Sequence, residues 1–256
     1  MSSLQENLER LEAAILKACG SAGRPRAEVE LMAVSKTYPL KALVEMAGLG
    51  VSLFGESRVQ EFAAKSAELN AERNALAAGA SVAALRSTIR VHLIGHLQSN
   101  KALRAAELFD AVDSLGSLRL AERLNEVAAR CGKRLPVLLE VKLSTEESKT
   151  GLDPGSDEAA QMLERLPDLQ HLQVQGLMTI APFDVAEAET RACFRGLRQW
   201  RDRWAAQYPR LSLDVLSMGM SGDFALAIEE GATRIRVGTS LFGARPLLTP
   251  SFQGQD

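Results

Sequence analysis

The sequence has little of what several common classes of protein require. Its 256 residues include three cysteines, Cys19, Cys131 and Cys193, which are widely separated and odd in number. This pattern matches neither a disulfide framework nor a zinc site, and it suits a reducing compartment. With only three histidines and no carboxylate-spaced partners for them, the sequence also argues against a metal site.

A strong charge of one sign and long apolar runs are missing too. The formal net charge is -2 and the isoelectric point is about 6.0, whereas nucleic-acid binding needs a concentrated basic surface. No apolar run reaches membrane-spanning length, and the first residues do not follow the pattern of a signal peptide. We therefore predict a cytoplasmic protein that binds a small metabolite and neither nucleic acid nor membranes.

The residues that are present alternate between helical and strand patterns. Leu4, Leu8, Leu11 and Ile15 recur at helical spacing and predict an N-terminal helix over residues 1–20. Eight short apolar runs follow, and each has the length of a buried strand. The runs span residues 29–36, 51–56, 89–95, 108–114, 135–143, 172–178, 211–218 and 233–238.

Helical patterns lie between these runs, at residues 39–48, 57–77, 98–106, 117–131, 156–166, 186–207 and 222–230. Ser117 and Ser221 stand where N-caps are expected, and Gly132 and Gly231 stand where two of the helices end. Eight strand–helix units in about 250 residues predict a (β/α)₈ TIM barrel, an α/β fold. A doubly wound open sheet is the alternative.

The domain organisation predicted from the sequence is simple. No internal repeat, linker or shift in composition marks a boundary, so we expect one domain over residues 1–256. Residues 246–256 would form a C-terminal tail outside the barrel.

Lys36 ends the first predicted strand, MAVSK. Taken alone, a lysine that reaches solvent past the rim of the barrel is the more ordinary interpretation. An apolar setting would lower the pKa of the amine and favour the neutral form that attacks aldehydes, so a Schiff-base lysine is the functional hypothesis.

Two glycine-rich segments form a second signal. LSMGMSGD (216–223) follows the seventh strand, and RVGTSLFG (236–243) ends the eighth. Glycines let backbone N–H groups approach an anion, and the loops after strands seven and eight are the usual phosphate site of this barrel. Helix capping and chain turning would explain either segment alone, but both together favour a phosphate site. Its candidate residues are Ser217, Gly219, Ser221, Gly238 and Thr239.

Arg234 and Arg236 lie on one side of the eighth strand by its two-residue period. For Arg234, a structural ion pair is as good an interpretation as a role in the site. For Arg236, which lies nearer the site, the ion pair is the weaker interpretation. A reactive lysine, a phosphate site and a fixed cation together describe a pocket for pyridoxal 5'-phosphate (PLP).

Short motifs along the chain carry a family resemblance. They are AVSK (33–36), FGESRVQE (54–61), HLIGHLQSNK (92–101), VDS (112–114), SKTG (148–151), GLM (176–178), LSMGMSGD (216–223) and RVGTSLFGAR (236–245). In this order and at these separations they resemble the YggS/PROSC family of PLP-binding, PLP-homeostasis proteins. Each motif is weak alone, and the set is highly specific.

The resemblance implies one PLP-binding barrel, similar to the N-terminal domain of alanine racemase, with Lys36 as the Schiff-base lysine. It also implies that Ser217, Met218, Gly238 and Thr239 surround the phosphate and that Arg236 faces the pyridine nitrogen. An arginine there would leave that nitrogen unprotonated and the ring a weaker electron sink.

The sequence departs from the family pattern at three places. Ser57 and Arg58 replace the asparagine and tyrosine of the frequent FGENYVQE motif, so any cofactor contact through that asparagine is in doubt. Lys142 stands where an asparagine often follows "EV" on strand five. It is a second strand-end lysine, and the direct AVSK match keeps Lys36 ahead of it.

We expect a monomeric PLP carrier or homeostasis protein with little catalytic turnover, whose recipients would be PLP-dependent apoenzymes. Alanine racemase uses a second, β-rich domain to supply an opposing base, and little chain follows Arg245 here. A small PLP-dependent racemase and a cofactor-free Schiff-base aldolase are the alternatives. A yellow colour after PLP addition separates the PLP carrier and the PLP-dependent racemase from the aldolase.

Overall fold

The computed structural model describes residues 3–75, 89–143 and 150–243. Its eight strands pair in sequence order, all in parallel, and β8 pairs with β1 to close the barrel. The predicted TIM barrel is confirmed and the open sheet is excluded. The strands are β1 (Glu30–Val34), β2 (Leu53–Glu56), β3 (Arg90–Leu93), β4 (Ala111–Leu115), β5 (Leu135–Glu140), β6 (Leu172–Met178), β7 (Val215–Ser217) and β8 (Arg234–Val237).

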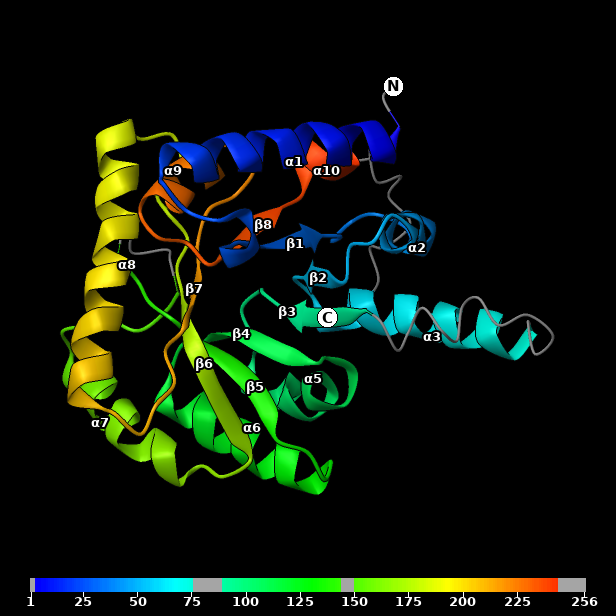
Figure 1. Ribbon diagram of the computed structural model, residues 1–256. Helices are drawn as coiled ribbons and strands as arrows, with labels where there is room; N and C mark the ends of the chain where they lie inside the picture. The colour runs from blue at the N-terminus through cyan, green and yellow to red at the C-terminus, as the bar shows by residue number, and fades with distance from the viewer. Residues whose placement is uncertain (1–2, 76–88, 144–149, 244–256) are drawn as a thin grey trace.

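Helices surround the barrel, as Figure 1 shows. In the described part of the chain, the α-helices are α1 (Leu4–Ser21), α2 (Leu40–Gly48), α3 (Val59–Ala75), α5 (Ala102–Leu108), α6 (Leu118–Arg130), α7 (Asp157–Arg165), α8 (Glu187–Gln207), α9 (Phe224–Glu229) and α10 (Thr239–Phe242). Three 3-10 turns, η1 (Arg26–Glu28), η2 (Ser99–Lys101) and η3 (Leu166–Asp168), complete the connections. No helix within these ranges is long and apolar enough to cross a membrane.

The N-terminal helix α1 is additional to the eight strand–helix units. Ser3 caps it through its hydroxyl, and Glu6 returns the hydrogen bond in a capping box. The helix lies alongside α9 and α10 (Figure 1), and Asn7 donates a hydrogen bond to the Leu241 carbonyl at 2.8 Å. Leu11 and Ile15 are buried, so the apolar stripe predicted from the sequence faces the barrel's outer layer.

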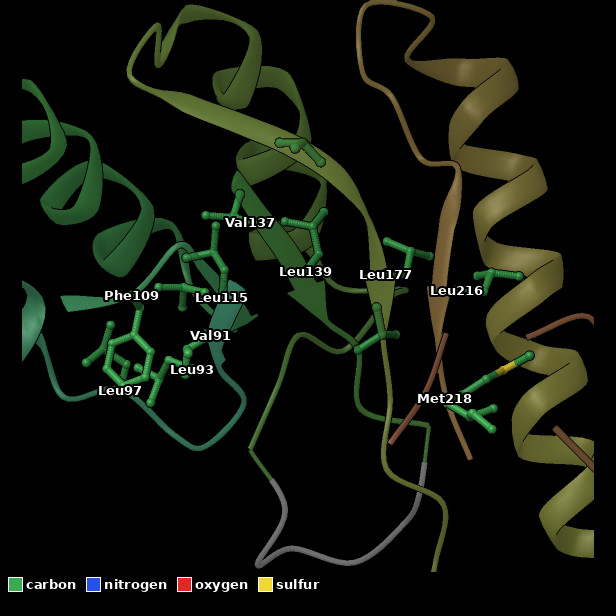
Figure 2. Close-up of a cluster of buried hydrophobic side chains, with 14 of the residues drawn as sticks. Val91, Leu93, Leu97, Phe109, Leu115, Val137, Leu139, Leu177, Leu216 and Met218 are labelled. Atoms are coloured by element: carbon green, nitrogen blue, oxygen red, sulfur yellow. The ribbon is translucent and has the colours of Figure 1, made fainter. Parts of the chain in front are cut away.

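The main apolar core lies between the strands and the helices. Val91, Val137, Leu139 and Leu177 belong to it, and each alternates along its strand with a residue that faces the barrel interior. Figure 2 shows this cluster running from β3 and β4 across β5 and β6 to β7. The interior itself holds buried polar side chains, among them those of Asp113 and Arg236. The strands are therefore less continuously apolar than those of a typical parallel sheet that is buried on both faces.

The strand and helix predictions hold, with differences at the ends. Ser117 caps α6 by accepting a hydrogen bond from the Leu120 amide, as predicted. The seventh strand is shorter than expected because a turn over residues 208–211, in which Leu211 donates to the Tyr208 carbonyl, is followed by irregular chain up to Val215. The predicted tail, residues 246–256, lies outside the described residues. None of the three cysteines forms a disulfide.

Candidate functional site

The carboxyl ends of all eight strands lie at one end of the barrel, here called the mouth. Because β8 pairs with β7 on one side and with β1 on the other, the loops after these three strands are neighbours. Met32 of β1 is level with Arg236 of β8, and Ala33 is level with Val237. The closed topology therefore brings the predicted lysine, phosphate and cation positions to the same side of the mouth.

Lys36 lies in the turn just beyond β1, two residues after the strand ends at Val34, and it is half-buried. The loop after β8 packs closely against this end of β1. A Cβ added to Gly238 would lie 3.3 Å from the Val34 carbonyl oxygen. The Tyr38 ring stacks on Phe242 with centroids 4.8 Å apart, so two contacts hold the loop of Lys36 beside the loop after β8.

Arg236 is a buried cation at the mouth, with 4% of its surface exposed. Its Nη1 donates to the carbonyl and hydroxyl oxygens of Ser217 at 2.7 and 2.9 Å, and its Nη2 donates to the Thr179 carbonyl at 2.8 Å. All three acceptors are neutral, and no carboxylate of the described residues lies within ion-pair distance. Burial lowers the pKa of Arg236 to about 10, against the opposing effect of Asp113, so the guanidinium stays charged at neutral pH.

The loop after β7 turns at Gly219, whose φ of +93° disfavours any residue with a side chain. A Cβ there would also lie 2.6 Å from the Cβ of Ala227. The Gly219 carbonyl accepts a hydrogen bond from the Arg236 amide at 2.9 Å. The position therefore requires glycine, and it ties the loop to β8 beside the buried guanidinium.

The N-cap predicted for Ser221 is wrong. Helix α9 begins at Phe224, and the N-cap position is Asp223, whose carboxylate accepts a hydrogen bond from the Met220 amide instead. The Ser221 hydroxyl accepts a hydrogen bond from the Ser240 amide at 3.4 Å, so it links the loops after β7 and β8.

Two further predicted positions differ in what they present. Thr239 is the first residue of α10 and is exposed, so its hydroxyl is accessible near the mouth. The side chain of Met218 is fully buried in the outer core, as Figure 2 shows, and its amide donates to the Arg234 carbonyl. Met218 can face a ligand only through its backbone.

The end of β5 carries a second pair of polar groups. Glu140 is 7% exposed and accepts a hydrogen bond from the Thr150 hydroxyl at 3.2 Å, and burial raises the pKa of its carboxyl. Lys142 is half-buried, and its amide donates to the Leu152 carbonyl. In an eight-stranded barrel β5 lies across from β1, so Glu140 and Lys142 stand on the far side of the mouth from Lys36.

The departures at Ser57 and Arg58 follow β2. Ser57 is half-buried, and its carbonyl oxygen would lie 2.2 Å from a Cβ on Gly95, so the loops after β2 and β3 meet there through backbone. Arg58 is exposed. The SKTG motif lies partly outside the described residues.

Below the mouth, polar side chains form a chain through the barrel interior. Asp113 contacts His92 Nδ1 at 3.0 Å and Arg234 Nη1 at 3.2 Å, and Arg234 Nε donates to Glu30 at 2.8 Å. Although burial opposes the effect, His92 and Arg234 lower the pKa of Asp113. Arg234 therefore forms structural ion pairs, which was one of the two interpretations that the sequence allowed for it. In the ranges that the structure describes, no three His, Cys, Asp or Glu side chains gather as a metal site would require.

A second polar cluster, behind the Lys36 turn, consists of Glu56, Glu61 and Lys65 and was not predicted from the sequence. Glu56 and Glu61 fall within the FGESRVQE motif, and Lys65 follows Glu61 at the i,i+4 spacing of a helical ion pair. This spacing was the only sign of the cluster in the sequence, and many ion pairs on exposed helix surfaces have the same spacing.

Comparison with known proteins places these features in a family. Residues 3–246 match the family model described as "Alanine racemase, N-terminal domain". Two similar curated proteins are each called "Pyridoxal phosphate homeostasis protein". The one from Pseudomonas aeruginosa is 39% identical, with 98% of this chain and 100% of the relative covered, and the one from Vibrio alginolyticus is 38% identical, with 96% and 99% covered.

Solved structures agree with this. PipY of Synechococcus elongatus, in a structure described as having PLP bound, is 40% identical and covers 94% of this chain and all of its own, with a TM-score of 0.79. Alanine racemase of Clostridium difficile is 17% identical, covers 95% of this chain and 57% of its own, and has a TM-score of 0.65. The second likeness is one of fold alone.

Proposed function

Because the chain belongs to the family of pyridoxal phosphate homeostasis proteins, we propose that it binds PLP and takes part in PLP homeostasis. The observation that carries this proposal is the buried guanidinium of Arg236 at the mouth. A buried charge without an ion-pair partner is unfavourable unless the site has a use for it. An anionic cofactor with an acceptor nitrogen matches that charge.

The residues around Arg236 fit such a cofactor by their chemistry. Ser217 and Thr239 bring hydroxyl groups to the loops after β7 and β8, and Gly219 and Gly238 permit close approach of backbone there. Hydroxyl and amide donors are the groups that proteins use for phosphate. We propose that these two loops hold the phosphate and that Arg236 donates to the pyridine nitrogen.

When bound, the cofactor supplies an aldehyde carbon that an amine can attack. We propose that Lys36 provides the amine and holds the cofactor covalently as a Schiff base. Its turn adjoins the loop after β8, where the phosphate would lie. Lys142 follows β5 and is separated from the loop after β8 by β6 and β7, which favours Lys36.

We propose that the protein turns over amino acids slowly or not at all. Arg236 keeps its proton at neutral pH, so it can only donate to the pyridine nitrogen and cannot accept a hydrogen bond from a protonated one, as the carboxylate in demanding PLP chemistry does. The hydroxyl of Tyr38, the tyrosine near the predicted site, donates to the Gly243 carbonyl at 2.6 Å. The hydroxyl proton of Tyr38 is thus held by the backbone that follows α10.

One observation favours a second candidate function, an amino-acid racemase. Glu140 stands across the mouth from Lys36, and its raised pKa suits proton transfer. A racemase needs acid–base groups on two sides of its substrate, and this pair would provide them.

Two measurements test the proposals. Titration of the purified protein with PLP should give a yellow species with a saturating absorption band, and a protein that stays colourless would overturn PLP binding. Incubation of the PLP-loaded protein with L-alanine should give no rapid D-alanine. Turnover of about 1 per second or faster, lost in Glu140→Gln, would establish the racemase instead.

The remaining expectations concern partners and state. We propose that PLP-dependent apoenzymes receive the cofactor and that the protein is a cytoplasmic monomer. Light scattering on the eluted protein measures its mass directly, and a dimer would contradict the second expectation. Recovery of activity by an apoenzyme mixed with the loaded protein, at a rate above that with an equal concentration of free PLP, would support the first.

A further inference from the structure

The turn that carries Lys36 has an unusual backbone. Thr37, the next residue, has a φ of +68°, a conformation that β-branched residues rarely adopt. Its hydroxyl oxygen is buried and has no hydrogen-bond partner among the described residues. Nothing in the residue type favours this conformation, so contacts from elsewhere must hold the turn in place.

Those contacts come from a buried cluster formed by Glu56, Glu61 and Lys65, here called the Lys65 cluster. The Glu61 carboxylate accepts a hydrogen bond from the Thr37 amide. Glu56 Oε1 accepts one from the Ser35 hydroxyl at 2.7 Å. The residues on both sides of Lys36 are therefore held by carboxylates of the cluster.

Lys65 joins the two carboxylates to the same turn. Its Nζ donates to the Ser35 carbonyl at 2.9 Å, to Glu56 Oε1 at 2.8 Å and to Glu61 Oε1 at 3.0 Å. These three bonds use all three donors of the ammonium group, so Lys65 is not the amine that meets an aldehyde. Its side chain is 9% exposed and that of Glu56 is fully buried.

Stabilisation of the fold is a poor explanation for this arrangement. Burying an ion pair removes its charges from water, and well-packed apolar residues of the same size often serve stability equally well. Burial raises the pKa of Glu56, and its second oxygen, Oε2, has no hydrogen-bond partner in the described residues. Burying these charges is unfavourable by itself, and the hydrogen bonds of the cluster converge on one turn. The cluster is therefore better explained by its effect on the conformation of that turn.

We propose that the Lys65 cluster is a positioning device that fixes the Lys36 turn in its left-handed conformation and thereby sets the rate at which Lys36 captures PLP. This inference rests on the proposed function. Glu61 acts through the Thr37 amide, and Lys65 holds Glu61 and Glu56 in register with the turn. None of the three is proposed to touch the cofactor.

The test uses Glu61→Ala, because Glu61 is partly exposed and its loss leaves the buried Lys65–Glu56 pair intact. Glu68→Ala, at an exposed position on the same helix, is the matched control. Without PLP, hydrogen–deuterium exchange of the Thr37 amide should be about tenfold faster in Glu61→Ala and unchanged in Glu68→Ala. This readout does not depend on the cofactor.

The second readout is the rate of borohydride-trapped labelling at Lys36, with PLP and with pyridoxal. Glu61→Ala should slow both labelling reactions about tenfold, because the defect lies in the turn and not in the phosphate site. Glu61→Gln keeps an acceptor for the Thr37 amide and should restore most of the rate. Adding Thr37→Gly to Glu61→Ala should restore part of it, since glycine adopts a positive φ without strain.

The outcomes separate the two proposals. Suppose that Lys36 is labelled in the protein without substitutions, and that Glu61→Ala changes neither the exchange rate of the Thr37 amide nor the labelling rate. The positioning role is then wrong, and PLP binding stands. If Glu61→Ala slows labelling but neither Glu61→Gln nor Thr37→Gly restores it, the effect does not run through the turn and the inference is again overturned. If the unmodified protein is not labelled at Lys36, the covalent function and this inference fail together.

Discussion

The loop after β7 offers a sharp test, because two of its glycines differ in what a side chain would meet. At Gly219 the backbone has a φ of +93°, and a Cβ would lie 2.6 Å from the Ala227 Cβ and 3.0 Å from the Phe224 Cα. At Gly222 an added Cβ meets nothing within 4 Å. Gly219→Ala and Gly222→Ala therefore make the same chemical change in strained and unstrained positions.

The expected magnitude for Gly219→Ala follows from these two effects. A left-handed backbone costs an L-residue roughly 1–2 kcal/mol, and overpacking costs typically about 1–3 kcal/mol. The free energy of unfolding should fall by about 2–5 kcal/mol, which corresponds to a melting temperature lower by roughly 4–20 °C. Gly222→Ala should stay within about 0.5 kcal/mol of the unmodified protein.

Urea unfolding of the cofactor-free proteins gives the free energies, and titration with PLP gives the affinities. Gly219→Ala should bind PLP more weakly than the unmodified protein, because the loop that would hold the phosphate is displaced. If Gly219→Ala unfolds at the same urea concentration as the unmodified protein and binds PLP equally well, the loop does not have the shape described, and the phosphate site built on it is wrong.

Two other predictions concern charged groups at the mouth. Burial raises the pKa of the Glu140 carboxyl above the ordinary value of 4.5 that it has in the unfolded chain. Between these two pKa values the folded state binds more protons than the unfolded state, so the free energy of unfolding falls as pH rises. Glu140→Gln removes this loss and keeps an acceptor for Thr150, so its melting temperature relative to the unmodified protein should rise between pH 4.5 and pH 7; a constant difference would contradict the raised pKa. Arg236→Gln should still allow capture by Lys36, but it should shift the absorption band and weaken PLP binding about tenfold or more, since a hydrogen bond to a charged donor is worth about 1.5–3 kcal/mol. An unchanged spectrum and affinity would remove Arg236 from the pyridine nitrogen.

Much of the fold could be predicted because the apolar runs are short and regularly separated by helical patterns. All eight predicted strands are present, and their closure into a barrel follows from the number of units and the length of the chain. The strand ends were less predictable. Residues 211–214 alternate between apolar and polar as a strand does, but the Leu211 amide donates to the Tyr208 carbonyl in a turn, and β7 begins only at Val215.

The candidate site was predictable where a residue type has few alternative uses. Gly219 and the buried Arg236 are of this kind, since a left-handed turn and a buried cation both need special support. Ser221 has many possible roles, and its link to Ser240 across two loops has no signal along the chain. The same holds for Lys65, which looks like an ordinary helical lysine until the barrel brings Glu56 and Ser35 against it.

Lys36 is the residue that we propose to hold PLP. The direct measurement is to incubate the protein with PLP, reduce it with borohydride, digest it and locate the modified lysine by mass spectrometry. We predict one predominant adduct, on Lys36, which Lys36→Ala abolishes. An adduct on Lys142, or labelling that persists at full level in Lys36→Ala, would contradict it.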